Sequence, residues 1–239
     1  MVKEFPDDWA GNALTAHVDV AIGNMMATTV KNSTEYPLLI ELDSCYETVI
    51  RGLIDPPGFL EGFFLMRSHA AFRAGCMLAM GGHNTETFPI IRNCLEYALY
   101  ALHVNRDPRL GEVWLRRHES ESTEAKVRQE FKHSKIMKTL EEVDSHAFKV
   151  AGSLYQRTID FGGHPNERAI TSSMGVKKGE GSHHYMQDYL SGGTMPHRHA
   201  LKSSAQIGLC ALLVLENIFH ARFESAGVGD RLIYLKSVL

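Results

Sequence analysis

The chain has 239 residues, a formal net charge of −3 and a sequence pI near 6.5. This acidic balance excludes the strongly basic footprint of a dedicated DNA-binding domain, although it leaves room for a local basic patch. A composition of 44% hydrophobic and 22% charged residues is that of a globular protein, and it predicts a single domain over residues 1–239.

Four cysteines lie far apart in the sequence, and no CxxC pair exists, which excludes a zinc ribbon or a thioredoxin-type motif. We expect reduced cysteines, mostly in the core, and a cytoplasmic location. Residues Met1–Trp9 are acidic and lack an apolar segment, so we expect no secretory signal. The longest apolar run, Ile207–Leu215, is about half of what a bilayer crossing needs, and it predicts a buried core helix with no membrane partner.

Helical spacing of apolar residues between glycine and proline breaks predicts an all-α bundle of about six to eight helices. The expected helices cover residues 8–30, 38–54, 60–80, 87–105, 107–117, 122–161 as one or two helices, and 197–223. Segments 60–80 and 87–105 are apolar on most faces, which is typical of helices at the centre of a bundle.

Residues 166–196 break the helical pattern, and a structureless stretch of roughly thirty residues is unusual inside a compact domain. Segments 168–176 and 182–190 flank Lys177-Lys178-Gly179-Glu180-Gly181, which suits a hairpin turn. We therefore predict an inserted β-hairpin or flap over 166–196, and a short C-terminal tail over 225–239.

A polar stripe follows one face of the otherwise apolar helix 87–105. Arg92, Glu96, Tyr100 and His103 are spaced by four, four and three residues, so they share one side of that helix. Charged groups on a central helix must be paired or line a wet pocket. We predict that they form a binding site together with Arg67 of the preceding helix; the alternative is an Arg92–Glu96 pair that only fixes bundle register.

His69 and Arg73 are four residues apart on that preceding helix and are predicted to project together as a structural network. The clusters His183-His184 and His197-Arg198-His199 have no third ligand at a recognised metal-site spacing. P-loop, GxGxxG and GxSxG motifs are also missing from the sequence. We therefore predict no metal and no cofactor, leaving long-range assembly of a metal site as the alternative.

His164 lies where a long helix ends at Gly162-Gly163 and the chain turns at Pro165. A histidine in that position is placed either for capping and packing or for acid–base chemistry.

The segments Ile90-Ile91-Arg92-Asn93-Cys94-Leu95-Glu96-Tyr97 and Leu154-Tyr155-Gln156-Arg157-Thr158, the latter leading to Gly163-His164-Pro165, resemble an uncharacterised bacterial family of helical proteins near the HEPN superfamily. The likeness covers about residues 60–223. It implies a helical bundle, often a homodimer. Many HEPN relatives are ribonucleases of toxin or phage-defence systems that use an arginine and a histidine with four to six residues between them.

Two stretches fit that spacing, Arg128 to His133 and Arg157 to His164, and the second is better placed because it ends a helix. Two hypotheses follow. In the first, the protein is a non-catalytic helical protein that binds a partner or a small ligand. In the alternative, it is a metal-independent endoribonuclease acting on RNA, in which Arg157 stabilises the scissile phosphate and His164 is the acid or base. The acidic chain and the weakly polar Thr158 after Arg157 favour the first.

Overall fold

The computed structural model describes residues 5–6, 8–9, 11–30, 34–53, 58–163, 165, 167–179 and 182–239. Over these residues it contains eleven α-helices, one π-helical turn and one two-stranded antiparallel sheet, which confirms the all-α class with a small hairpin. The helices are α1 (Ala13–Val30), α2 (Tyr36–Arg51), α3 (Phe59–Gly81), α4 (Asn84–Arg106), α5 (Arg109–Leu115), α6 (Glu121–Glu130), α7 (His133–Val143), α8 (Ser145–Thr158), α9 (Glu167–Thr171), α10 (Met195–Ser225) and α11 (Val228–Val238). The strands are β1 (Met174–Gly179) and β2 (Ser182–Gln187), and the π-helical turn is Ile159–Gly163.

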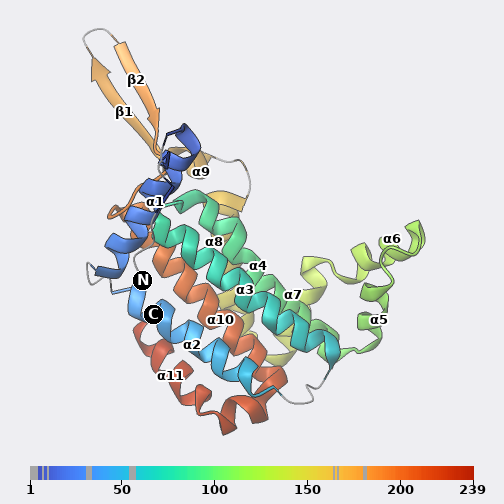
Figure 1. Ribbon diagram of the computed structural model, residues 1–239. Helices are drawn as coiled ribbons and strands as arrows, with labels where there is room; N and C mark the ends of the chain where they lie inside the picture. The colour runs from blue at the N-terminus through green and yellow to red at the C-terminus, as the bar shows by residue number, and fades with distance from the viewer. Residues whose placement is uncertain are drawn as a thin grey trace.

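The three longest helices, α3, α4 and α10, form the centre of the bundle, and α2, α8 and α11 pack against them (Figure 1). The predicted burial of Ile207–Leu215 in α10 is confirmed, since every residue of that run except Leu213 is buried. By length and hydropathy α10 is also the one helix of the described chain that could cross a membrane, and 61% of its most apolar window is buried inside the bundle.

Helix α10 can approach α3 closely because it carries a glycine at the crossing. A Cβ atom built on Gly208 would lie 2.4 Å from Cε2 of Phe72, whose side chain is itself 1% exposed in the core. Any larger residue at this position has to displace that ring, so the crossing distance between α3 and α10 depends on Gly208.

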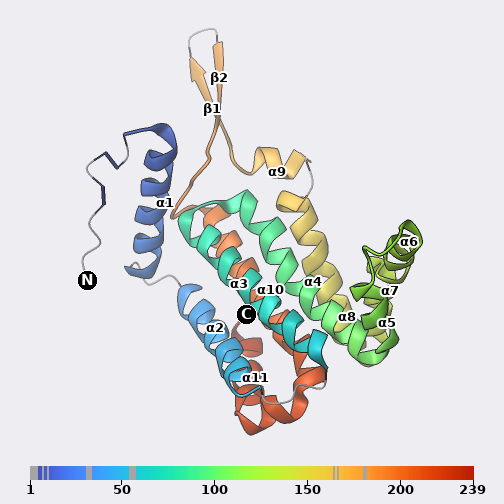
Figure 2. The ribbon, with the colours of Figure 1, turned by 45° about the vertical axis from the view of Figure 1, so that its right-hand side comes forward.

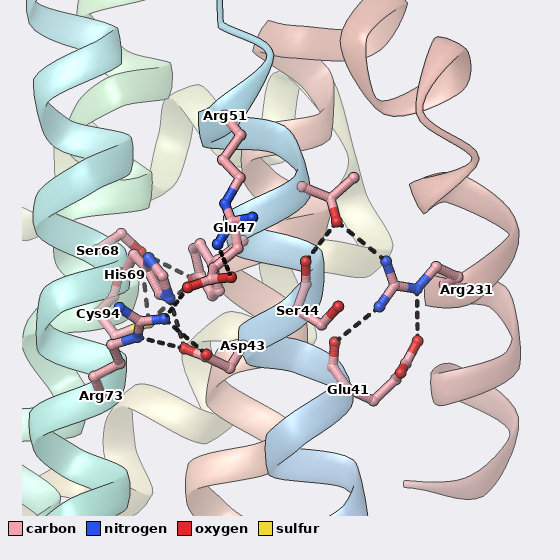
Figure 3. Close-up of polar contacts among 12 residues, drawn as sticks. Glu41, Asp43, Ser44, Glu47, Arg51, Ser68, His69, Arg73, Cys94 and Arg231 are labelled. Carbon is pink, nitrogen blue, oxygen red and sulfur yellow. Dashed lines mark hydrogen bonds and ion pairs between the residues drawn. The ribbon is translucent and has the colours of Figure 1, made fainter.

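Charged groups hold α2 against α3 (Figure 3). The Asp43 carboxylate accepts hydrogen bonds from Nε2 of His69 at 2.6 Å and from Nε of Arg73 at 2.7 Å. A second carboxylate, that of Glu47, accepts hydrogen bonds from Nη2 of Arg73 at 2.6 Å and from Nη2 of Arg51 at 3.0 Å. The prediction that His69 and Arg73 project together is confirmed, and they do so toward α2.

Burial opposes the charge on Asp43, but the hydrogen bonds from Arg73 and His69 outweigh that effect and leave the pKa of Asp43 below its usual value. Burial also lowers the pKa of His69, against the attraction of Asp43. His69 is therefore neutral near pH 7, and its Nε2–H donates to the carboxylate.

Two arginines hold the opposite side of α2, as Figure 3 shows for Arg231. Nε of Arg231 on α11 donates to Oε1 of Glu41 at 2.6 Å, and Nη2 of Arg222 near the end of α10 donates to the carbonyl oxygen of Thr48 at 2.5 Å. The C-terminal part of the chain therefore packs against α2. The predicted tail over 225–239 is wrong: after Gly227, with φ at +65°, the chain forms α11 and buries Leu232 and Leu235.

Segment 122–161 forms three helices and a π-helical turn where one or two helices were expected, because polar caps interrupt it. Ser120 and Thr123 make a reciprocal capping box at the start of α6, and Asp144 accepts hydrogen bonds from the amides of His146 and Ala147 at the start of α8. With α9 and α11, these additional helices bring the number of α-helices in the described chain to eleven, where about six to eight were expected.

The predicted hairpin is confirmed. Strands β1 and β2 pair antiparallel with Val176 opposite Tyr185, and they project away from the bundle (Figures 1 and 2). Residues 168–171, expected in the first strand, belong instead to the short helix α9. All side chains of β2 are exposed, so this hairpin contributes little to the core.

A first prediction concerns the crossing of α3 and α10. Gly208→Ala should lower the free energy of unfolding by about 1–3 kcal/mol, because the new methyl group overpacks against Phe72. Gly23→Ala is the control: its Cβ meets nothing within 4 Å, and it should raise stability by about 0.5–1 kcal/mol through helix propensity. Urea unfolding of both variants measures this, and equal effects would contradict the close approach.

A second prediction concerns the clamp on α2. Asp43→Asn should cost about 1–3 kcal/mol at pH 7, because it weakens charged hydrogen bonds that are only partly exposed. The pKa of Asp43 is lowered by folding, so its contribution is complete above the unfolded pKa of about 3.9 and is lost as pH falls through the folded pKa. The deficit of the variant should therefore shrink in acid.

The matched control for Asp43→Asn is Glu119→Gln, which breaks the exposed Arg116–Glu119 pair and should cost about 0.5 kcal/mol or less. Chemical denaturation at pH 7 and at acidic pH compares the two. A deficit for Asp43→Asn no larger than that of the control would show that the network does not hold α2.

Candidate ligand-binding site

A large cavity opens between α8, α10 and α11. Its volume is about 900 Å³, within the range of small-molecule sites in proteins. Arg157 lies at one end, and Glu216 and His220 lie at the other. The other lining residues come from α8 and its N-cap residue, from α10 and from the C-terminal segment. They are Asp144, His146, Ala147, Lys149, Val150, Ser153, Leu154, Gln206, Leu209, Cys210, Leu213, Asn217, Lys236 and Leu239.

Arg157 enters this cavity from the last turn of α8 with only neutral partners. Its Nη1 donates to Oε1 of Gln206 at 2.6 Å and to Oγ of Ser203 at 3.4 Å. The ion pairs among the described residues include other arginines but not Arg157. Burial lowers the pKa of the half-buried guanidinium, although the group remains charged. The cavity thus contains a positive charge that forms no ion pair with a carboxylate of the described residues, although Asp144 and Glu216 line other parts of it.

Gln206 is oriented so that its carbonyl oxygen faces Arg157. Its Nε2 donates to the main-chain oxygen of Leu239 at 3.0 Å, which leaves Oε1 for the guanidinium. Ser203, Gln206 and Cys210 follow at spacings of three and four residues, so α10 presents them on one side. The amide of Gln206, itself held by Leu239, thus fixes the Nη1 side of Arg157.

Beyond Gln206 the cavity floor becomes apolar and then polar again. Leu209 and Leu213 continue the same side of α10, and Glu216 follows about 15 Å along the axis from Gln206 at the rise of an α-helix. Burial raises the pKa of Glu216, against the opposite effect of His220. Along α10 the cavity therefore changes from the Arg157 cation through aliphatic side chains to Glu216 and His220, while Asp144, Lys149 and Lys236 add further charges to its lining.

The predicted polar stripe divides into two parts. Nε of Arg92 lies 3.4 Å from Oε1 of Glu96, and the same oxygen accepts a hydrogen bond from the Tyr155 hydroxyl at 3.2 Å. The ring of His133 stacks on Tyr155 with centroids 3.9 Å apart. Glu96 and Tyr100 line a second, smaller cavity of about 170 Å³ between α4, α7 and α8.

Burial and nearby charges shift the pKa values of two residues that line this smaller cavity. Burial raises the pKa of Tyr100, and the neighbouring Glu96 adds to that effect. Burial lowers the pKa of His133, and the charge of Arg92 lowers it further. The Arg92–Glu96 pair expected as the structural alternative is therefore present, and it also borders a cavity.

His103 and Arg67 lie away from that cluster. Nδ1 of the buried His103 lies 2.7 Å from the Thr139 hydroxyl, and Nε2 lies 3.2 Å from the carbonyl oxygen of Glu130. Burial lowers the pKa of His103, so a neutral ring donates to the carbonyl and accepts from the hydroxyl. Arg67 is exposed on α3, with its guanidinium 5.4 Å from the ring centre of Tyr97.

The predicted partner of Arg157, His164, lies outside the described residues, so their approach stays a prediction. A different histidine lies near the arginine: Arg157 lowers the pKa of His199, after the larger effect of burial. The His199 ring packs 4.7 Å from Phe161, and its Nε2 is buried with no hydrogen-bond partner among the described groups.

The other histidines do not form a metal centre in the described part of the chain, where no three histidine, cysteine or acidic residues come together. His197, for example, is buried and accepts a hydrogen bond from the amide of Gly193 at 3.1 Å. The expected burial of the cysteines is confirmed, since Cys45, Cys76, Cys94 and Cys210 are all buried.

No protein-family model, no curated protein and no solved structure matches this chain. The geometry of its own residues therefore carries the functional argument. Arg157 is predictable as a site residue from the sequence, whereas Ser203, Gln206 and Glu216 are not, because their only signal is their polarity within an apolar helix.

A third prediction contrasts two arginines. Arg157→Met in the ligand-free protein should leave the free energy of unfolding unchanged or raise it by about 1 kcal/mol, because it removes a half-buried charge that lacks a carboxylate partner. Arg231→Met should cost about 1–3 kcal/mol, since it breaks a short hydrogen-bonded pair with Glu41. Equal losses in urea unfolding would show that Arg157 serves mainly stability.

Proposed function

We propose that this chain is a non-catalytic binding protein for a small amphipathic carboxylate, held in the cavity between α8, α10 and α11. The observation that carries the proposal is Arg157, a half-buried cation with no carboxylate ion pair among the described residues, in a cavity with aliphatic walls. A partly buried charge is costly without a counterion, and an arginine in that state on the wall of a cavity is suited to a ligand that supplies the negative charge.

The form of the cavity supports the ligand class. The guanidinium of Arg157 matches a carboxylate, which it binds through two parallel N–H donors, and Lys149 and Lys236 add positive charge to the same cavity. The aliphatic side chains of Leu154, Leu209 and Leu213 then contact an apolar body. Gln206 supports this arrangement by holding one side of Arg157, which leaves the remaining donors of the fork for the ligand.

The test uses octanoate and 1-octanol, which share a chain and differ in charge. Titration calorimetry should show octanoate binding to the wild-type protein at least about tenfold more tightly than octanol, a difference of about 1.4 kcal/mol. Arg157→Gln should remove that preference by eliminating the charged donor pair. Arg51→Gln removes an exposed arginine of α2 and should change nothing.

Two outcomes contradict the proposal. Equal affinity for octanoate in the wild-type protein and in Arg157→Gln would place the binding elsewhere. RNA cleavage in the presence of EDTA, lost in His164→Ala, would favour the ribonuclease alternative, in which Arg157 contacts a phosphate rather than a carboxylate. The proposal expects the RNA to remain intact.

A further inference from the structure

Helix α3 carries apolar side chains on two opposite sides, and only one side is covered. Its inner side packs into the core through buried residues such as Phe64, Phe72 and Ala79. Its outer side exposes Phe59 at 69%, Met77 at 55% and Phe63 at 48% of their surface. The all-round hydrophobicity of segment 60–80 that predicted a central helix is thus only half satisfied within one molecule.

The exposed residues on the outer side follow a regular repeat. Phe59, Phe63, Met66, Ala70, Arg73 and Met77, here called the α3 seam, are spaced by four, three, four, three and four residues. All six are exposed. This alternation is that of the a and d positions of a heptad, which places one line of side chains where a second helix packs. A contiguous line of this kind differs from single exposed apolar residues, which need no explanation.

The α3 seam is complementary to itself in the reverse direction. With a twofold axis between Met66 and Ala70, an antiparallel copy brings the large Met66 opposite the small Ala70. The same operation brings Phe59 opposite Met77, and a thioether beside an aromatic ring is a favourable contact. Because both copies make the same contacts, the interface closes on itself as a dimer.

The third pair places Phe63 opposite Arg73, a contact that suits a guanidinium over an aromatic face. Arg73 does not enter such an interface as an unpaired charge, because Asp43 and Glu47 already neutralise it from α2. These carboxylates also fix the guanidinium in position while its side chain stays 51% exposed. The one charged member of the α3 seam is therefore held toward α2, and the exposed half of its side chain is what a neighbouring ring covers.

We propose that α3 docks antiparallel against α3 of a second copy of this chain, through the α3 seam and about a twofold axis between Met66 and Ala70. Arg67 flanks the seam next to that axis, so the two copies of Arg67 face one another. Their repulsion weakens the dimer at low ionic strength, and screening by sodium chloride strengthens it.

Sedimentation velocity of the full chain over a range of concentrations tests this arrangement. The wild-type protein should be a dimer whose dissociation constant falls as sodium chloride is added. Met66→Lys, which adds positive charge at the axis, should weaken the dimer by about tenfold or more. Met26→Lys is the matched control, since Met26 is 65% exposed on α1 and outside the seam. Arg67→Gln should tighten the dimer at low salt.

Cross-linking tests the register. When a Met66→Cys chain is mixed with an Ala70→Cys chain of different mass, disulfides should form between unlike chains in preference to like chains. A protein that stays monomeric at all concentrations, or a dimer that Met66→Lys leaves intact while circular dichroism shows it folded, would overturn the proposal. Preferential disulfides between two Met66→Cys chains would overturn the antiparallel register.

Discussion

Burial of α10 is the constraint on which the rest of the structure depends. Its apolar middle touches α3 and α4 at the centre of the bundle, and α2, α8 and α11 pack around it. Gly208 sets how closely α10 can approach Phe72 of α3. The same helix then supplies the apolar floor of the ligand cavity through Leu209 and Leu213. One helix, α10, therefore supplies both the packing at the centre of the bundle and the floor of the proposed site.

The arginines of this protein differ in whether their partners are carboxylates or neutral groups. Arg73 and Arg231 each meet a carboxylate at 2.6–2.9 Å, and they hold α2 from both sides (Figure 3). Arg157 is more deeply placed than Arg73 yet has only the neutral oxygens of Gln206 and Ser203. Arg222, on the α2 side, also has only neutral partners, the backbone oxygens of Val49 and Thr48. The position of Arg157 on the wall of a cavity, and not the missing counterion alone, is therefore what supports the proposed carboxylate site.

Local signals in the sequence were sufficient for the long elements. Helical periodicity placed α3, α4 and α10 within a few residues, and the glycine-containing turn indicated the hairpin. The extra helices after residue 120 depend on caps by Ser120 and Asp144, and α11 on burial of Leu232, which periodicity over a short segment did not reveal. The cavity joins residues of α8 and α10 about fifty positions apart, so only tertiary packing brings Arg157 to Gln206.

Nuclear magnetic resonance offers the most direct test that the cavity at Arg157 binds an amphipathic carboxylate. Octanoate is titrated into labelled protein while the Arg157 Nε–H signal and the methyl signals of Leu209 and Leu213 are followed. If octanoate binds in this cavity, these signals move together and saturate at one concentration of octanoate, while the Nε–H signals of Arg73 and Arg231 stay in place. Saturating shifts confined to other residues, or an Arg157 signal that does not respond, would contradict binding in this cavity.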